Sequence, residues 1–333
     1  MHTLPHEKEI RSQFPALKRE SGEKQAIFLD GPAGSQVPQV VADAVASYKL
    51  NPNANGGGFF ATSQESDALM DECQEVAAAF FGTPDPCEIV FGPNMTSLTN
   101  KVSRLLKTQW QAGDEIILSS SEHDANYTPW VKAAESKGVV IKTIPLNTED
   151  CTLNQEAYRQ LLSPKTKLVA VGLASNASGT IHPIRSMADA AHEFGAKFYV
   201  DAVHYAPHGL IDVEALGCDF LVASAYKFFG PHVGILWGKR KYLEELPSEK
   251  LRPCDASLPW SMMSGTPNLE GIAGAKAAIE YIAGLTQVPA SQSLRSRIEA
   301  SFEAIETYEK DLLNHLLAGI AKICDRSRRA RVR

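Results

Sequence analysis

Polar side chains follow four apolar segments of this sequence, each near the point where the segment ends. In chain order they are His123, Asn176, Asp201, His204, Ser224, Tyr226 and Lys227. If the four segments are parallel strands of one sheet, their carboxyl ends meet at one edge, where α/β proteins bind their ligands. We therefore expect a lysine, a carboxylate, two imidazoles, an amide and hydroxyl groups to line one site.

A lysine and a carboxylate are the pair that pyridoxal 5′-phosphate (PLP) requires. A partly desolvated lysine is a nucleophilic amine that can form a Schiff base, a role that suits Lys227. A carboxylate keeps the pyridine nitrogen protonated, so that the ring acts as an electron sink, and Asp201 suits this role. The ring cation lowers the pKa of that carboxyl, so we expect it to be ionised. His123 would stack on the ring, and Asn176 and His204 are candidates to meet its hydroxyl.

The phosphate of PLP needs hydroxyls and backbone N–H groups. The segment GPNMTSLTN (92–100) opens a helical pattern with Thr96 and Ser97 in its first turn, and helix N-termini bind anions. Ser224 would add a further hydroxyl. Each of these residues alone is more often a cap, a turn residue or a solvated surface group. Their joint arrangement is what indicates a cofactor site.

Seven apolar stretches predict the strands that would position these side chains. They span residues 87–92, 115–120, 139–146, 167–175, 196–202, 218–224 and 234–238. Helical patterns lie between several of them, at 97–110, 154–162 and 186–195. Such alternation predicts an α/β fold, a three-layer sandwich whose mostly parallel central sheet is covered by helices on both faces.

The order of these motifs resembles the class V aminotransferase family of fold-type I PLP enzymes, most closely its cysteine desulfurase-like members. The resemblance runs from about Ile27 to about Leu285. It rests on FLDGPAGSQVP (28–38), EHDANYTPW (122–130), SNASGTIHPI (175–184), VDAVHYAPH (200–208), SAYKFFGPHVGILWG (224–238) and SGTPNLEGIAG (264–274).

What the resemblance implies agrees with the roles argued above, with Lys227 and His123 as catalytic residues. It adds Thr266, which would reach the phosphate bound by the partner subunit, and so implies a homodimer with a shared site. The implied function is that of a PLP-dependent enzyme acting on an amino-acid substrate, a C–S lyase (desulfurase) or an aminotransferase.

The sequence also departs from the family pattern. Met95 precedes Thr96 where the family usually has a small residue, His204 stands where many desulfurases have Gln, and Tyr226 stands where many have His. Met95 and Tyr226 stay candidate cofactor contacts. The reactive Cys and the substrate-binding Arg of desulfurases lie in a small C-terminal domain, which we expect to be truncated here. The alternative function is therefore a shortened chain that binds PLP but is catalytically impaired.

The expected organisation has four parts. They are an N-terminal segment (1–30), a PLP-binding large domain (31–285), a long amphipathic helix leading to a truncated small domain (286–324) and a basic tail (325–333). The helix is predicted because apolar residues from Leu294 to Ile323 recur close to every 3.6 positions, and we expect it to lie against an apolar surface. Segment 51–60 has the composition of a loop.

Composition excludes several classes of function. The 333 residues carry a net charge of −6, which disfavours nucleic-acid binding. The sequence has no secretory signal, no membrane-spanning apolar run and six scattered cysteines, so we expect a cytoplasmic protein. A metal site built from His123, Asp124, Asp201, His204 and His208 is a weaker alternative, because it leaves Lys227 without a role. We expect no metal.

Overall fold

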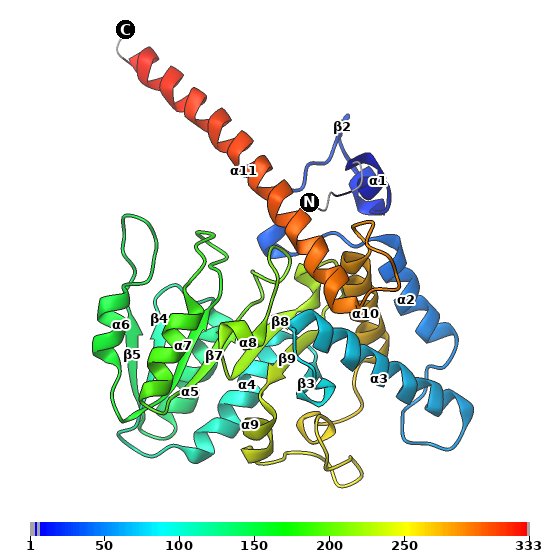
Figure 1. Ribbon diagram of the computed structural model, residues 1–333, viewed down its shortest axis with the longest axis vertical. Coiled ribbons are helices and arrows are strands. Elements are labelled where there is room, and N and C mark those ends of the chain that lie inside the picture. The colour runs from blue at the N-terminus through cyan, green and yellow to red at the C-terminus, as the bar shows by residue number, and fades with distance from the viewer. Residues whose placement is uncertain (1–3, 5–6, 332–333) are drawn as a thin grey trace.

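A seven-stranded sheet lies at the centre of the computed structural model, which describes residue 4 and residues 7–331, with side chains up to residue 323 (Figure 1). The strands are β3 (Ile89–Gly92), β4 (Glu115–Ser119), β5 (Val140–Ile144), β6 (Thr166–Gly172), β7 (Lys197–Asp201), β8 (Phe220–Ser224) and β9 (Gly234–Gly238). Their order is β3-β9-β8-β7-β6-β4-β5. Within this sheet β9 is antiparallel to both neighbours and the other adjacent pairs are parallel. The predicted fold class and the seven predicted strands are confirmed.

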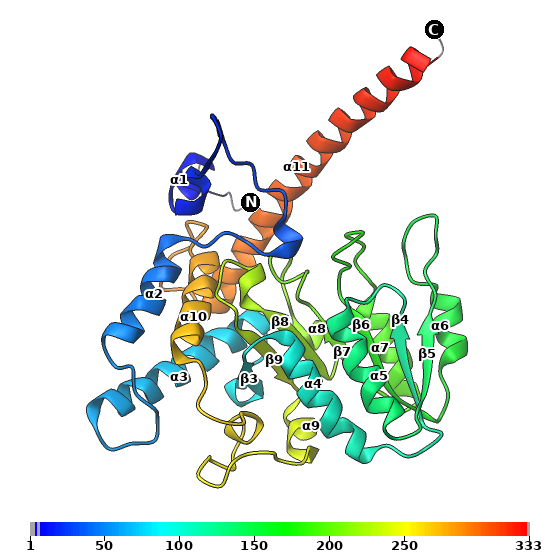
Figure 2. The ribbon, with the colours of Figure 1, turned by 180° about the vertical axis from the view of Figure 1, so that it is seen from behind.

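Helices cover both faces of the sheet. The α-helices of the described residues are α1 (Glu7–Ser12), α2 (Gln39–Leu50), α3 (Ala61–Phe81), α4 (Met95–Leu106), α5 (Thr128–Glu135), α6 (Gln155–Leu161), α7 (Ile184–Glu193), α8 (Val213–Leu216), α9 (Arg240–Glu245), α10 (Leu269–Ala283) and α11 (Leu294–Arg331). Helices α4 and α5 lie in front of the sheet in Figure 2, and α7 and α8 lie in front of it in Figure 1. Every residue of β8 and β9 is buried, as expected for strands covered on both faces.

A second group of helices lies beside the edge of the sheet that β3 forms. Helix α10 packs against α2 and α3, and the three lie together in both views (Figures 1 and 2). The connection between α2 and α3 has no helix or strand at residues 51–60, so the predicted loop is confirmed. The short strands β1 (Glu20–Ser21) and β2 (Lys24–Gln25) pair in an antiparallel ladder apart from the main sheet.

Helix α11 confirms the predicted helix and part of its predicted surroundings. Its first turns pack against α10 and α3 and bury Ile298, Phe302 and Ile305. Beyond them the helix projects away from the rest of the chain (Figure 1). There Leu316 is 58 % exposed and Ile323 is 68 % exposed. The expectation that this helix lies against an apolar surface therefore holds for its first turns and not for the residues beyond them.

The lengths of the packing elements explain this difference. Helix α11 has 38 residues, whereas α10, which it contacts most, has 15. At about 1.5 Å per residue, α11 is on the order of 57 Å long and extends well past its partner. The helix continues to Arg331, and the side chains of the basic tail (325–333) lie outside the described residues. No helix in the described residues combines the length and the apolar character needed to cross a bilayer.

Candidate active site

A cavity of about 320 Å³ opens at the carboxyl edge of the sheet. Residues that follow β4, β6, β7 and β8 line it, together with the N-terminus of α4. All the predicted site residues except Thr266 are among them: Met95, Thr96, His123, Asn176, Asp201, His204, Ser224, Tyr226 and Lys227. The strand order brings them together, because β6, β7 and β8 are parallel neighbours whose carboxyl ends coincide.

Lys227 lies in a short 3-10 turn, Ala225–Lys227, that begins where β8 ends. Only 9 % of the residue is exposed. Its Nζ donates a hydrogen bond to the carbonyl oxygen of Pro32 and lies 4.8 Å from the centre of the Tyr226 ring. The amine is thus held inside the cavity, against the segment that precedes α2.

Two backbone segments hold Lys227 in this place. Phe229 has φ +71°, which is strained for a residue with a side chain, and its N–H donates to Ser35 Oγ over 2.8 Å. On the facing segment Gly34 has φ +152°, and a Cβ there would lie 3.2 Å from the Tyr226 ring. Glycine at position 34 therefore allows the two segments to approach closely. The strained backbone of Phe229 lies two residues from Lys227.

Asp201 ends β7 on the floor of the cavity. The residue is 8 % exposed, and its Oδ1 accepts a hydrogen bond of 2.9 Å from the backbone N–H of Val203. Burial raises the pKa of Asp201 to about 6, although the Val203 N–H and the charges of His123 and Lys227 oppose the rise. The expectation that a ring cation lowers this pKa concerns the loaded protein and stays a prediction.

His123 both caps a turn and lines the cavity. Its Nδ1 accepts a 3.1 Å hydrogen bond from the N–H of Ala125 at the start of the turn Asp124–Asn126. In the neutral ring the proton is therefore on Nε2. The side chain is otherwise exposed toward the cavity, which leaves a ring face available for stacking.

His204 and Asn176 stand at the mouth of the cavity. Burial, together with the positive charges of His208 and Lys227, lowers the pKa of His204, and Glu309 opposes this. The rings of His204 and His208 are 5.3 Å apart. Asn176 is exposed in the loop between β6 and α7. Both residues are placed to meet a ligand that enters from solvent.

The first turn of α4 forms the opposite wall. Asn94 caps the helix by accepting a 2.8 Å hydrogen bond from Ser97 N–H, and Met95 N–H donates to Ser224 Oγ over 3.2 Å. A Cβ at Gly234 would lie 2.4 Å from the carbonyl carbon of Asn94. Glycine in β9 is therefore what lets the helix start so close to the sheet. Thr96 is exposed at this end, as a phosphate-binding residue requires.

Thr266 is not part of this cavity. It is exposed in the loop before α10 and lines two other surface hollows, one with Lys101 and Arg104 and one with Asp67 and Asp71. Its predicted role toward a partner subunit stays a prediction.

Several cavity residues were not predicted from the sequence. They are Ala33, Ser121, Glu122, Ser175, His182 and His232. Glu122 is the most perturbed, because burial raises its pKa to about 7. His182 is 4 % exposed, and among the described residues its buried Nδ1 has no hydrogen-bond partner. Both lie inside segments that define the resemblance, beside residues that were selected.

The donor set of the cavity fits PLP. The chain supplies an amine, a buried carboxylate, an imidazole with a free face, and a helix N-terminus flanked by hydroxyls, each matching one part of that molecule. The unpartnered Nδ1 of His182 is a further buried polar atom in the wall. Within the described part of the chain, no three His, Cys, Asp or Glu side chains come together as metal ligands would.

Comparison with known proteins agrees with this geometry. The family model described as aminotransferase class-V matches residues 27–323. A probable cysteine desulfurase of Vibrio cholerae is 33 % identical over 310 residues, covering 89 % of this chain and 76 % of the relative. A cysteine desulfurase of an Enterobacter species is 34 % identical, covering 97 % of this chain and 79 % of the relative.

A solved structure, the apo form of a cysteine desulfurase from Thermococcus onnurineus NA1, is similar over most of its length. It has a TM-score of 0.84 and 26 % identity, and the match covers 97 % of this chain and 78 % of that one. The resemblance seen in the sequence is thereby confirmed, and the chain belongs to the class V aminotransferase family.

Proposed function

We propose that this chain is a PLP-dependent, cysteine desulfurase-like enzyme that acts on an amino acid. The observation that carries the proposal is the convergence of Lys227, Asp201 and His123 on one cavity at the N-terminus of α4. Membership of the class V aminotransferase family supports the same cofactor.

Each of these three residues has a separate task. Bound PLP supplies an electron sink for charge that develops at the substrate Cα. Lys227 holds the cofactor through its amine and, once substrate has displaced it, moves the proton at Cα. Asp201 keeps the ring nitrogen protonated, and its burial strengthens that interaction. His123 covers one face of the ring and orients it.

The remaining predicted residues orient the cofactor. Thr96 and Ser224 bind the phosphate at the N-terminus of α4, where the N–H of Met95 holds the Ser224 hydroxyl in place. Asn176 and His204 meet the ring oxygen. Tyr226, stacked on His232 with ring centres 4.8 Å apart, closes the side next to Lys227.

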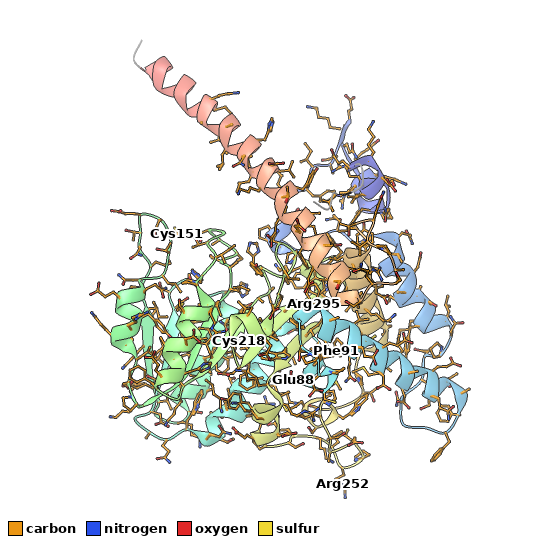
Figure 3. All side chains as sticks on the ribbon, in the orientation of Figure 1. Glu88, Phe91, Cys151, Cys218, Arg252 and Arg295 are labelled. Carbon is orange, nitrogen blue, oxygen red and sulfur yellow. The ribbon has the colours of Figure 1, made fainter. Side chains whose placement is uncertain are left out.

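L-cysteine is the proposed substrate. The chemistry requires a primary amine, and the names of the relatives point to cysteine. Among the described cysteines, however, none lines the cavity. Burial raises the pKa of Cys73 and Cys218, and Cys151 lies at the tip of a loop (Figure 3). None of these thiols is placed to receive sulfur.

A second function is favoured by one observation. Neither a cysteine nor an arginine is among the cavity-lining residues in the described chain, so the sulfur acceptor and the cation that would bind a substrate carboxylate are not found there. The alternative is a protein that binds PLP but turns substrate over poorly.

A homodimer with a shared site is also proposed, on the position of Thr266. Its exposure in a separate hollow suits contact with a second subunit. Mixing Lys227→Ala and Thr266→Ala chains tests this. If Thr266 serves the neighbouring site, each mixed dimer recovers PLP affinity at one of its two sites. Recovery that does not exceed the average of the two separate variants contradicts sharing.

The central experiment measures the visible absorbance of the chain with PLP, before and after excess L-cysteine, followed by borohydride reduction and peptide mapping. We expect a visible band, its perturbation by cysteine, and reductive trapping on Lys227. Lys137→Ala, which removes an exposed surface lysine, is the matched control for Lys227→Ala.

The outcomes separate the two functions. Release of alanine and sulfide in the presence of a thiol reductant supports the desulfurase, and a band that no amino acid perturbs supports the binding-only alternative. Absence of any band in the wild type contradicts both.

A further inference from the structure

Glu122 is a half-buried residue whose carboxyl the proposed mechanism does not use. It lies between β4 and His123, and three donors point at it. Asn126 Nδ2 donates to Oε2 over 2.6 Å, Gly172 N–H donates to Oε1 over 3.0 Å, and the hydroxyl of Ser119 also donates to Oε1. A carboxylate that accepts several hydrogen bonds is expected to fix the positions of the groups that donate them.

These contacts join the two parts of the site. Asn126 belongs to the turn that His123 caps, and its Oδ1 accepts a 3.0 Å hydrogen bond from Trp130 Nε1 in α5. Gly172 ends β6 and pairs in register with Asp201 of β7. Glu122 therefore ties the segment that carries His123 to the strand end beside Asp201.

A hydrogen-bonded chain leads from Glu122 to the cavity wall. Ser119 Oγ lies 3.0 Å from Ser121 Oγ, which lies 3.1 Å from Nε2 of His182. The other ring nitrogen, Nδ1, is the buried atom without a partner among the described residues. The chain thus has a carboxyl at one end, an imidazole at the other and two hydroxyls between them.

We propose that Glu122 is a positioning residue for His123 and Asp201, and that the chain from Glu122 through Ser119 and Ser121 to His182 passes one proton between its ends. The part of this inference that concerns the cofactor rests on the proposed function. The proton chain itself is a property of the polypeptide alone.

The proton transfer balances along the chain. With Glu122 ionised, His182 donates its Nε2 proton to Ser121, Ser121 donates to Ser119, and Ser119 donates to Glu122. When Nδ1 of His182 takes up a proton, the Nε2–H bond breaks and each hydroxyl passes its proton onward. An O–H bond forms at Glu122, and His182 is left neutral with its proton on Nδ1.

The charges around Glu122 decide where that proton resides. Burial and the charge of Asp201 both raise the pKa of Glu122, to about 7, although its three hydrogen bonds oppose this. Burial lowers the pKa of His182, so near neutral pH the carboxyl competes well for the proton. His123 and Lys227 in turn act on the charge of Asp201. Whether Glu122 carries a proton therefore determines whether a second negative charge acts on Asp201.

The proton chain is tested first without cofactor. The chain labelled with 15N-histidine is titrated, and the ring nitrogens of His182 are followed by NMR. We expect an inflection at about pH 7 in the wild type and its loss in Glu122→Gln and in Ser121→Ala, which breaks the chain at its middle. Glu135→Gln, an exposed carboxyl of α5, is the matched control. The same His182 titration in wild type and Glu122→Gln overturns the chain.

The positioning role is tested by exchanging donor and acceptor. In Glu122→Gln the new amide N–H faces Asn126 Nδ2, so a partly buried hydrogen bond is lost, and we expect about tenfold weaker PLP binding. The double variant Glu122→Gln/Asn126→Asp restores that pair and keeps the acceptor for Trp130. We expect PLP affinity to return to within about threefold of wild type, while the His182 inflection stays absent.

Two results on folded variants contradict the positioning role. One is a Glu122→Gln variant that binds PLP as the wild type does, and the other is a double variant that recovers no affinity. Circular dichroism establishes that each variant is folded. If the wild type binds no PLP, the proposed function fails, while the cofactor-free titration still decides the proton chain.

Discussion

The cavity buries charged groups, whereas the far half of α11 exposes apolar ones. Lys227, Asp201 and Glu122 are held inside the molecule by hydrogen bonds to the backbone and to polar side chains. Leu316 and Ile323 protrude from α11 although they continue an apolar series. The difference shows that a side chain is buried where the tertiary structure supplies partners for it, and that its polarity alone does not decide this.

The near half of α11 illustrates the same rule within one helix. There Arg295 donates hydrogen bonds of 2.8 Å to the carbonyl of Ile211 and 3.1 Å to that of Ala79, and forms an ion pair with Asp212 (Figure 3). Ile298 and Phe302 are fully buried just beyond it. The two halves of the helix have similar patterns and different neighbours.

The largest expected effect is the loss of Lys227. Lys227→Ala should abolish the visible band of bound PLP and lower turnover by at least about a thousandfold, because no other amine lies in the cavity lining of the described chain. Absorbance and product assays measure both. A band retained in this variant would show that another amine holds the cofactor. The buried charge of Lys227 would then have no role in binding it.

Truncation in the near half of α11 comes next. Phe302→Ala should lower the free energy of unfolding by about 3 to 5 kcal/mol, because it leaves a hole against Phe80, whose ring centre is 6.0 Å away. Urea unfolding followed by tryptophan fluorescence measures the change. A loss under about 1 kcal/mol would mean that this half is no better packed than the far half.

The carboxyl of Glu122 should make the free energy of unfolding depend on pH. The pKa of Glu122 is raised from 4.5 to about 7, so the folded chain keeps a proton that the unfolded chain has lost in this window. Its stabilising contribution is complete below pH 4.5 and is lost as the pH rises through 7. The difference in unfolding free energy between wild type and Glu122→Gln should fall by on the order of 3 kcal/mol across this window. A difference that does not vary with pH contradicts the raised pKa.

Asp201→Asn should weaken catalysis without removing the cofactor. The amide keeps the size of the side chain but cannot neutralise a ring cation, so we expect turnover to fall by about a hundredfold while a shifted visible band remains. Steady-state kinetics and absorbance test this. Turnover equal to that of the wild type would remove Asp201 from the mechanism.

The smallest expected effect belongs to the far half of α11. Leu316→Glu should change the free energy of unfolding by under about 0.5 kcal/mol, because the side chain is already 58 % exposed. It should also reduce concentration-dependent association, which exposed apolar patches favour. Light scattering at several concentrations measures the second effect. Substantial destabilisation would show that this half is covered in solution and would remove the contrast with the near half.

Much of the site could be predicted because local sequence carries the relevant signals. Asp201 and Ser224 follow apolar runs that form buried strands, and parallel strands end at a common edge, so their proximity follows from the pattern. The roles of Pro32 and His182 could not be predicted in this way. Pro32 acts through a backbone carbonyl that any residue possesses, and His182 through a chain of contacts to residues about 60 positions away.

The sequence by itself determined the alternation of strands and helices, the family, and the set of side chains at the sheet edge. These follow from periodicity and from residues that stand immediately after strands. Only the tertiary structure decided that the Glu122 carboxyl meets donors from Asn126 and Gly172, that the segment around Pro32 covers Lys227, and that α11 leaves its apolar residues uncovered past α10. The reason is physical: burial and pKa depend on which distant segments come into contact, and periodicity reports only the local chain.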